Sequence, residues 1–376
     1  MDGQNKKKKL RSGYTTGACA AAAAKAALQV LCGELPPERV EIPFPDGSRH
    51  SFALCRCRKN ADSVLASVVK DAGDDPDVTN GAEIGVELRW LDFTAAGDTK
   101  INPGSDAGKK GAVSFLQGRG VGRITKPGLP LAVGEVAINP VPRTMIFAAL
   151  DEAMPAQMRQ PLAVQVFVEN GEILAKKTLN KRLGILGGLS ILGTTGIVRP
   201  ISAKAWTDTI EASMAVAKAA GLDEIVLSTG RSSEAAVQKH LQCPEEALVM
   251  MGDYLRYALE AAKRHGFTTI HLAEMWAKLV KAALGVPQTH VRNGALEVRD
   301  AVNLLGELGL SAGKQQELAE ANTAWQLYEE LERWQEQEVI VAVAKRAQAQ
   351  AEQWSGLAVQ VYLVTAADGV VLHVPH

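Results

Sequence analysis

The spacing of apolar residues changes near the middle of the chain, and the two halves predict different architectures. Up to about residue 180, short apolar runs flank turn signals such as Pro45-Asp46-Gly47 and Asn170-Gly171, a pattern typical of β-hairpins. An alanine-rich helix after Gly17 and a second helix from Asn139 to Met154 interrupt the strands. This mixture predicts an α+β domain.

Two segments of the first half carry a more specific pattern. The apolar residues between Val64 and Val69 recur at helical spacing, which predicts a helix from Asn60 onward. The run from Glu172 to Thr178 follows the Asn170-Gly171 turn, which predicts the second strand of a hairpin.

The alternating glycines from Gly118 to Gly122 resemble part of a dinucleotide-binding fingerprint. That motif lies between a strand and a helix, but the following segment 123–128, RITKPG, cannot open a helix. We therefore interpret these glycines as a bulge within a strand.

After residue 200, strands and helices alternate at the spacing of crossover connections. The predicted strands are 224–227, 247–251 and 268–272, and the predicted helices are 203–220, 233–241, 253–265 and 274–284. This alternation predicts a parallel sheet with helices on its faces. Charged helices follow from Ala312 to Gln353, and a last hairpin pairs Leu357–Val364 with Val370–His373.

These patterns predict a fold of the class α/β plus α+β, in three parts. Residues 1–185 form an α+β domain with hairpins, and residues 186–300 form a doubly wound-like parallel α/β domain. Residues 301–376 are expected to pack back on the core as helices and a closing hairpin.

The glycine-rich stretch Thr178–Ser202 combines a short apolar strand with the turn Gly193-Thr194-Thr195-Gly196. A strand, a glycine turn and a helix in this order bring backbone N–H groups close to a ligand, because glycine lacks the Cβ that would block the approach. The alternative is a tight turn that only packs a helix on a sheet. In parallel sheets, ligands bind at the carboxyl ends of strands, where Ser228-Thr229-Gly230 and Gly252-Asp253 also fall. This convergence favours a nucleotide-like or other polar cofactor in the second domain.

Three further segments carry candidate chemistry. Thr15-Thr16-Gly17 precedes the alanine-rich helix and is either an ordinary N-cap or a polar-ligand site at the helix start. His290 lies in a loop and is either a general acid, base or ligand, or a structural hydrogen-bonding residue. Four carboxylates crowd seven positions: Asp71, Asp74, Asp75 and Asp77. They either form a solvated acidic turn, or hold a proton, a cation or ligand N–H groups between them.

Composition narrows the classes of function. The formal net charge of −1 and the isoelectric point of about 6.7 give no excess positive charge that would attract nucleic acid or an anionic membrane. Five cysteines without a CxxC pair argue against a disulfide framework or a zinc site. Lys6–Lys9 and the apolar run after them resemble a signal peptide, but Lys25 interrupts that run, and no run reaches the ~20 apolar residues of a membrane span. We therefore expect a cytoplasmic protein that binds no metal, nucleic acid or membrane.

Six segments together resemble one known family. They are RSGYTTGACAAAAAKAAL, VVKDAGDDPDVTNGAEI, GVGRITKPGL, AINPVPRTMI, AKKTLNKRLGILGGLSILGTTGIVRPIS and KLVKAALGVPQTHV. Through them the whole chain is similar to the CbiD family, the cobalt-precorrin-5B (C1)-methyltransferases of the anaerobic cobalamin pathway. Many members have His where this chain has Asn80, so the resemblance gives that position no catalytic part. The family also has more than one loop pattern at Arg231–Glu234, which leaves the role of that loop open.

The resemblance implies methyl transfer from S-adenosylmethionine to C1 of cobalt-precorrin-5B, which gives cobalt-precorrin-6A and S-adenosylhomocysteine. We expect the second-domain turns to hold the cofactor, and the acidic turn with Thr15-Thr16-Gly17 to face the macrocycle across a cleft. The cofactor-binding candidates are Gly187, Gly188, Gly193, Thr194, Thr195, Gly196, Ser228, Thr229 and Gly230. The catalytic candidates are Asp71, Asp74, Asp75, Asp77 and His290.

The substrate carries many carboxylates, so basic residues in glycine- and proline-rich loops are candidates to pair with them. The substrate-binding candidates are Thr15, Thr16, Gly17, Lys126, Arg143 and Arg199, with Lys181 and Arg182 in the same kind of loop. The alternative for the basic residues is a solvated surface.

Two other functions compete with the enzyme. A tetrapyrrole carrier would bind the macrocycle without transforming it, but it has no need of a second polar pocket. A phosphate-binding α/β enzyme such as a kinase would need a GxxxxGK[ST] motif, which the sequence lacks. The sequence leaves the oligomeric state open, and a homo-oligomer is compatible with it.

Overall fold

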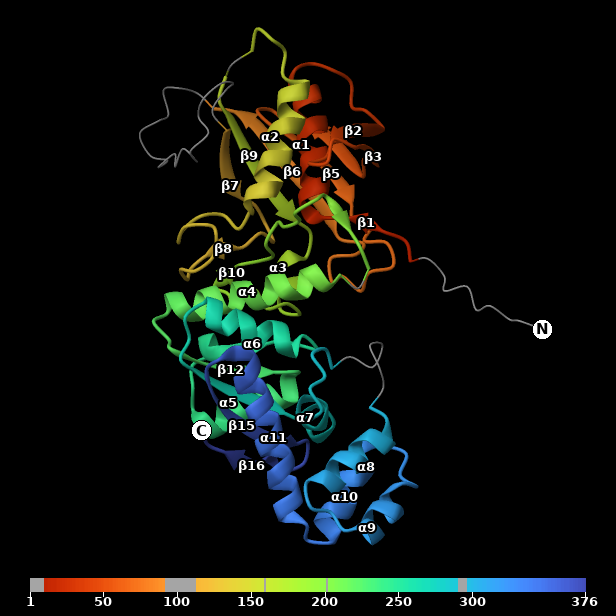
Figure 1. Ribbon diagram of the computed structural model, residues 1–376. Coiled ribbons are helices and arrows are strands. Elements are labelled where there is room, and N and C mark those ends of the chain that lie inside the picture. Colours follow the sequence, from red (N-terminus) through yellow and green to blue (C-terminus); the bar gives the residue numbers. More distant parts are fainter. Residues whose placement is uncertain (1–9, 92–112, 159, 201, 290–295) are drawn as a thin grey trace, which may run out of the picture. The chain divides into compact units, whose positions relative to one another are not determined.

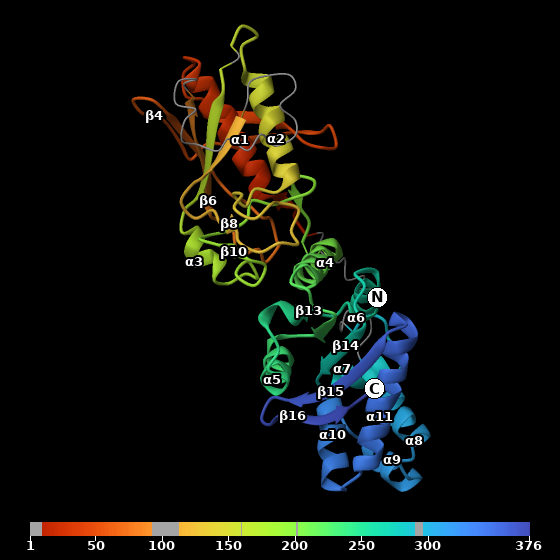
Figure 2. The same cartoon turned by 90° about the vertical axis from the view of Figure 1, so that its left-hand side faces the viewer.

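The computed structural model describes residues 10–91, 113–158, 160–200, 202–289 and 296–376. The chain divides into two compact units, Met1–Ser202 and Ala203–His376, and their elements are labelled in Figure 1 and Figure 2. Within the described ranges, no helix combines the length and the apolar character that crossing a bilayer demands.

The first unit is organised around a five-stranded sheet with the order β4-β5-β6-β9-β7. Its strands are β4 (Arg56–Lys59), β5 (Val64–Val69), β6 (Glu83–Trp90), β9 (Leu162–Val168) and β7 (Val113–Gln117). β7 runs parallel to β9, and the other neighbours are antiparallel.

Two helices pack together over this sheet (Figure 1). Helix α1 (Thr16–Leu31) lies against β5 and β6, and α2 (Pro140–Ala153) packs beside α1. The alanines of α1 between Ala18 and Ala27 are fully buried. Their small side chains let the helix lie close to the sheet and to α2 at the density of a protein interior.

Shorter elements complete the first unit. β2 (Arg39–Pro43) and β3 (Arg49–Ala53) form the hairpin that the Pro45-Asp46-Gly47 turn predicted. The others are β1 (Gly13–Tyr14), β8 (Arg123–Ile124), α3 (Gly171–Ala175), β10 (Ile185–Leu186) and β11 (Ile197–Val198).

The glycine-rich stretch belongs to the first unit, and this corrects the predicted boundary after residue 185. Its short strands pair within that unit, β10 with β8 and β11 with β1, both antiparallel. The boundary between the units lies after Ser202. The stretch is held in the first unit because it pairs with strands that are distant in sequence. The local alternation of strands and helices, from which the boundary was predicted, contains no information on such pairing.

The helix predicted from Asn60 onward is absent, because Val64–Val69 forms strand β5. Val64, Ala66 and Val68 are buried, while the backbone pairs with β4 on one side and β6 on the other. The apolar spacing fits both periodicities, and the branched valines pack well on a sheet between two partner strands.

The segment predicted as a strand from Glu172 begins instead with the short helix α3. Asn170 adopts a left-handed conformation with φ of 56° and opens this helix. The Glu172 carboxylate then accepts a hydrogen bond from the Gly120 N–H over 2.7 Å, which fixes the first helical turn to a loop distant in sequence.

The glycines at Gly118–Gly122 form a turn with one isolated bridge rather than a bulged strand. Strand β8 follows them, and no helix opens there. The prediction that this segment is not a dinucleotide fingerprint is therefore confirmed.

The second unit contains one five-stranded sheet with the order β13-β12-β14-β15-β16. Its strands are β12 (Glu224–Ser228), β13 (Leu248–Met250), β14 (Thr269–Glu274), β15 (Ala358–Thr365) and β16 (Gly369–Val374). β13, β12, β14 and β15 run parallel, which confirms the parallel sheet predicted from the alternation. β16 pairs antiparallel with β15 at one edge.

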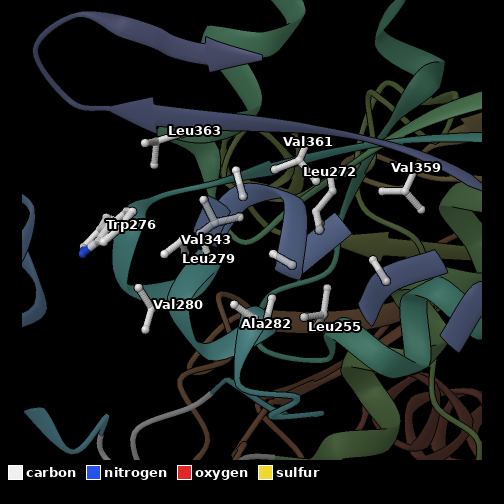
Figure 3. Packing of buried hydrophobic residues seen from close by; sticks show 14 of the residues in the cluster. Leu255, Leu272, Trp276, Leu279, Val280, Ala282, Val343, Val359, Val361 and Leu363 are labelled. Carbon is white, nitrogen blue, oxygen red and sulfur yellow. The ribbon is translucent and has the colours of Figure 1, made fainter. Parts of the chain in front are cut away.

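Helices cover both faces of this sheet. On one face, Leu272 and Val361 of the strands pack against Val343 of α11 (Figure 3). On the other face, Val237 of α5 packs against Val226. The helices are α4 (Ala203–Ala219), α5 (Arg231–Leu241), α6 (Leu255–Arg264), α7 (Trp276–Ala283), α8 (Val298–Glu307), α9 (Ala312–Leu318), α10 (Ala324–Arg333) and α11 (Gln337–Ser355), with a 3-10 turn η2 (Glu245–Ala247).

The closing hairpin is part of the second unit's sheet, so residues 301–376 are not a separate third part. β15 pairs with β14 along its length, from Thr269 opposite Ala358 to Glu274 opposite Leu363. Val359, Val361 and Leu363 lie in the same core cluster as the helices of this unit.

Candidate functional site

Three polar segments that are distant in sequence meet in the first unit. The N–H of Tyr14 donates to the carbonyl of Asp71 over 2.7 Å, and the N–H of Thr15 donates to the carbonyl of Gly196 over 2.9 Å. The start of α1, the acidic turn and the glycine turn therefore form one assembly. The predicted cofactor turn at Gly193–Gly196 lies beside the predicted macrocycle residues, not in the second unit.

The start of α1 has the contacts of a structural cap. The hydroxyl of Thr15 accepts a hydrogen bond from the Ala18 N–H over 3.2 Å. The Gly17 N–H donates to the carbonyl of Leu192 over 3.1 Å, and the hydroxyl of Thr16 bonds to the same residue. Thr15 and Thr16 are buried. The cap interpretation of Thr15-Thr16-Gly17 accounts for these contacts, because the protein itself takes up the N-terminal donors.

Two cations of the first unit pair with two of the four carboxylates of the acidic turn. The guanidinium of Arg11 contacts both oxygens of Asp71, over 2.5 and 2.8 Å, and the Arg11 N–H donates to Asp74 over 2.6 Å. The ammonium of Lys70 lies 2.7 Å from Asp77, and its side chain is 1% exposed. Arg11 therefore holds Asp71 and Asp74, whereas Asp77 is held separately by Lys70.

The pKa values of this turn fit ionised carboxylates. The hydrogen bonds from Arg11 and then from the Gly73 N–H lower the pKa of Asp71 to about 2. Burial pushes the pKa of Asp77 upward, but the charge of Lys70 and hydrogen bonds from Lys70 and Thr79 outweigh it and leave that pKa below its ordinary value. Asp71 and Asp77 are therefore ionised at neutral pH, and the structure does not support a proton held at either of them.

The glycines of the central stretch make close packing contacts. A Cβ on Gly188 would lie 2.3 Å from Gly120, and one on Gly193 would lie 2.5 Å from the side chain of Thr15. Gly196 has a φ of +86°, and its Cβ would lie 2.5 Å from the ring of Phe44. The tight-turn interpretation explains these three positions. Thr194 and Thr195 are exposed, as is Gly187.

The basic candidates differ in whether their side chains are already hydrogen-bonded to other residues of the chain or are exposed. Arg143 donates to the carbonyl of Ile138 over 2.8 Å and to Glu135 over 2.9 Å, and its side chain is 19% exposed. Lys126 donates to the carbonyl of Arg182 over 3.2 Å. Arg199 and Lys181 are exposed on the first unit. Arg199 and Lys181 are therefore better placed to bind a ligand than Arg143, whose guanidinium is hydrogen-bonded to the segment that precedes α2.

In the second unit, the strand order places a switch point between β12 and β14. The chain leaves β12 through α5 to β13 on one side, and continues through α6 to β14 on the other side. At such a point the two following loops diverge and leave a crevice where ligands bind in α/β sheets. Ser228-Thr229-Gly230 lies at the carboxyl end of β12, as predicted, and Gly230 is the N-cap of α5.

Glu274 ends β14 and lies beside this turn. Its carboxyl is completely buried, and the Thr229 hydroxyl donates to its Oε2 over 2.5 Å. Among the described residues, Glu274 Oε1 and the buried Ser228 Oγ have no hydrogen-bond partner. Buried polar atoms are rarely left in this state, so each oxygen marks a place for a hydrogen-bonding group that the described residues do not supply.

Burial raises the pKa of Glu274 to about 8, although the Thr229 hydrogen bond and the charge of Lys278 oppose the shift. The carboxyl is therefore mostly protonated at neutral pH. Sequence reasoning missed Glu274, because it was counted as the first residue of a helix. The available signal was a carboxylate directly after an apolar strand whose carboxyl end meets that of β12.

The third predicted loop, Gly252-Asp253, also belongs to this unit and is tied to α7. The ammonium of Lys278 contacts the carboxylate of Asp253 and donates to the carbonyl of Thr289 over 2.9 Å. The Thr289 N–H donates to the carbonyl of Asp253 over 3.0 Å. His290, a catalytic candidate, lies outside the described residues.

Comparisons with known proteins match the chain in two ranges. Residues 3–200 match the CbiD family, and residues 288–375 match the CbiD C-terminal domain. The chain belongs to the CbiD family. The Thr229–Glu274 pair lies between the two matched ranges, so its place in a CbiD site rests on the structure of this chain.

Several relatives within the CbiD family are close in sequence. A cobalt-precorrin-5B C(1)-methyltransferase from Desulfotalea psychrophila is 51% identical over 358 residues, which cover 95% of this chain and 96% of the relative. The protein of the same name from Geotalea daltonii is 49% identical over 326 residues, 85% of this chain and 87% of the relative. A crystal structure of a cobalamin biosynthesis protein (CbiD) from Archaeoglobus fulgidus is 27% identical, covers 72% of this chain and 79% of its own, and has a TM-score of 0.38.

Proposed function

We propose that this chain is a methyltransferase of cobalamin biosynthesis that transfers a methyl group from S-adenosylmethionine to C1 of cobalt-precorrin-5B. The single observation that carries this proposal is the 51% identity to a relative of that name over 95% of the chain. The products are cobalt-precorrin-6A and S-adenosylhomocysteine. The competing carrier function would require binding of the macrocycle without any change in its mass.

The methyl donor is placed at the switch point of the second unit. Gly230 has extended backbone with φ of −158°, and a Cβ added there would meet nothing within 4 Å. The free oxygens of Ser228 and Glu274 lie at the ends of the two strands that flank the switch point. The open space beside Gly230 and the unsatisfied carboxyl oxygen of Glu274 fit a polar, nucleoside-like group.

When bound, S-adenosylmethionine supplies an activated methyl group, whose bond to sulfur breaks with its electron pair as the bond to C1 forms. The chain needs no covalent nucleophile for this reaction. Its own residues align the two reactants and exclude water, and such orientation contributes up to ~7–11 kcal/mol in favourable cases. The hydrogen bond from Thr229 fixes the Glu274 carboxyl, and the ion pair of Lys278 with Asp253 holds the neighbouring loop against α7.

The macrocycle is placed on the first unit. Arg199 and Lys181 are exposed there and suit the carboxylates of the substrate, and the exposed hydroxyls of Thr194 and Thr195 lie in the same glycine-rich stretch. Thr15-Thr16-Gly17 holds the glycine-rich stretch through Leu192 and Gly196, and Arg143 holds the segment Glu135–Ile138. Lys126 is bonded to the neighbouring loop carbonyl of Arg182 and shares that role.

The acidic turn is assigned to charge stabilisation. Asp71 and Asp77 are ionised, so neither donates a proton, and the turn as a whole, with four carboxylates against Arg11 and Lys70, offsets positive charge that develops during C-methylation. Single Asp→Asn changes at Asp71, Asp74, Asp75 and Asp77 are expected to slow turnover with the affinity for S-adenosylhomocysteine retained. Wild-type turnover in all four variants would leave the turn a purely structural role.

The decisive experiment is anaerobic incubation of the purified protein with cobalt-precorrin-5B and methyl-labelled S-adenosylmethionine, followed by mass analysis of the macrocycle. We expect one labelled methyl group on the macrocycle and one equivalent of S-adenosylhomocysteine. Binding of the macrocycle without a gain in mass would support the carrier instead. Loss of both binding and mass gain would contradict both functions.

A further inference from the structure

We propose that Glu274 binds a hydroxyl group of the ribose of the methyl donor through its free carboxyl oxygen. The inference rests on the proposed function, since that function supplies the nucleoside. It assigns a ligand group to a residue that the sequence patterns did not single out and that lies outside both ranges matched to the CbiD family.

The position of Glu274 follows from the register of the parallel sheet. Ser228 of β12 pairs with Ala273 of β14, so Thr229 and Glu274 are the next residues of the two strands at the carboxyl edge. Their side chains lie on the same face, two residues beyond Leu227 and Leu272, which both belong to the large core cluster. The 2.5 Å hydrogen bond therefore joins the two strands at the switch point itself.

One oxygen of the carboxyl is fixed by this bond, and the other has no partner among the described residues. Leaving a buried polar atom without a hydrogen bond lowers the folding equilibrium constant by roughly 5- to 100-fold. A ligand group that bonds to this atom therefore gains a comparable factor in binding affinity. The free oxygen is closed to solvent, and the adjoining turn Thr229–Gly230 is half-buried.

The charges around Glu274 favour a hydroxyl over a cation as the partner. In the part of the chain that the structure describes, the charged groups that act on Glu274 are Lys278 and Asp253, and they are already paired with each other. Burial keeps Glu274 protonated at neutral pH. A cationic ligand group would first require removal of that proton in a dry environment, whereas a hydroxyl both donates and accepts and bonds to a neutral acid directly.

The test is a comparison of ligands and variants by isothermal titration calorimetry. S-Adenosylhomocysteine and its 2′-deoxy and 3′-deoxy analogues are titrated into the wild-type chain, Glu274→Gln and Glu274→Leu. We expect the wild type to bind one deoxy analogue about tenfold or more weakly than the parent compound. Glu274→Gln, which keeps a neutral hydrogen-bonding group, retains this discrimination, and Glu274→Leu loses it.

Several outcomes overturn the inference, and each is distinct from a failure of the proposed function. Equal binding of all three ligands by the wild type rules out a ribose hydroxyl bond, and undiminished discrimination by Glu274→Leu assigns that bond to another residue. Either result leaves the proposed function intact if the labelled-methyl assay succeeds.

Release of about one proton on binding, seen as a dependence of the heat on buffer ionisation, would show a cationic partner and also overturn the inference. If Glu274→Leu does not fold, the inference is tested by the wild-type comparison of the three ligands and by Thr229→Val. Thr229→Val is expected to weaken the binding of S-adenosylhomocysteine, because the Glu274 carboxyl loses the hydrogen bond that fixes it.

The same titrations test the donor site itself. An absence of S-adenosylhomocysteine binding by the wild type, together with no methyl transfer, would remove the proposed function and the inference with it. Methyl transfer with normal binding and no discrimination among the three ligands would remove only the inference.

Discussion

The hydroxyl of Thr229 donates a 2.5 Å hydrogen bond to the buried carboxyl of Glu274, and this bond joins the carboxyl ends of two adjacent parallel strands. Thr229 was predicted from its place after an apolar strand, and Glu274 is its partner only because β14 lies next to β12 in space. The pair gives the second unit a neutral acid with one free oxygen at the position where α/β sheets bind ligands.

The ionisation of Glu274 is expected to make stability depend on pH. The folded chain keeps the proton up to a pKa of about 8, whereas the unfolded chain releases it near the ordinary value of 4.5. Below that lower value both states are protonated, and the group has no effect on stability. Between the two values the folded state holds the extra proton, so stability falls as pH rises, by roughly 3–5 kcal/mol in total for this buried group.

Glu274→Gln removes this dependence, because its amide does not titrate. Urea unfolding of wild type and variant from pH 4 to about pH 9 measures the effect, since all other titrations cancel in the difference. The free energy of unfolding of the variant should rise relative to that of the wild type up to about pH 8, and the difference should then stay constant. Parallel stability curves over this range would show that Glu274 is not held protonated by the fold.

Gly230→Val is expected to fold normally and to lose affinity for S-adenosylhomocysteine by about tenfold or more, because its side chain enters the space proposed for the ligand. The backbone there is extended, and nothing lies within 4 Å of an added Cβ. Calorimetric titration measures the affinity. Gly313→Val is the matched control, because Gly313 lies in α9 of the same unit with equal room for a Cβ.

Gly196→Val does not serve the same purpose. Its φ of +86° and the contact of its Cβ with Phe44 predict a destabilised first unit whatever the ligand does. Equal affinities of Gly230→Val and Gly313→Val for S-adenosylhomocysteine would move the donor site away from the β12 turn.

Asp77→Ala is expected to destabilise the first unit by about 3 kcal/mol or more. The change leaves the ammonium of Lys70 unpaired, with its side chain 1% exposed, and an uncompensated buried charge is costly. Adding Lys70→Met removes that charge and should restore part of the loss. Asp74→Ala is the control, with an expected cost below about 1 kcal/mol, because its bond to the Arg11 N–H is exposed.

Thermal and urea unfolding of the four proteins measure these effects. If Lys70→Met in the Asp77→Ala background lowers stability further, the buried ion pair is not the cause of the destabilisation.

Arg199→Ala and Arg143→Ala should separate substrate binding from structure. Arg199 is exposed, so its loss is expected to weaken macrocycle binding by about tenfold without a change in unfolding free energy. Arg143 is bonded to Glu135 and to the carbonyl of Ile138, so its loss should lower stability by about 1–3 kcal/mol. Equilibrium binding of cobalt-precorrin-5B and urea unfolding measure the two quantities. The reverse pattern would place the macrocycle on Arg143.

The alternation of short apolar strands and helices after residue 200 was enough to predict a parallel sheet with Ser228-Thr229-Gly230 at a strand end, because each element there has its own local periodicity. The same kind of reasoning failed at Val64–Val69, where the spacing fits a helix and a strand alike. Two flanking strands, distant in sequence, decided that segment.

The sequence by itself determined the family resemblance, the parallel sheet and the turn at Ser228–Gly230, since these depend on motifs and on neighbours along the chain. Only the tertiary structure decided that the glycine-rich stretch belongs to the first unit. It also decided that Arg11 and Lys70 stabilise the ionised carboxylates of Asp71 and Asp77. It also decided that Glu274 is buried against Thr229. Strand pairing, burial and charge pairing depend on residues brought together from distant parts of the chain, and no local pattern encodes which of them will meet.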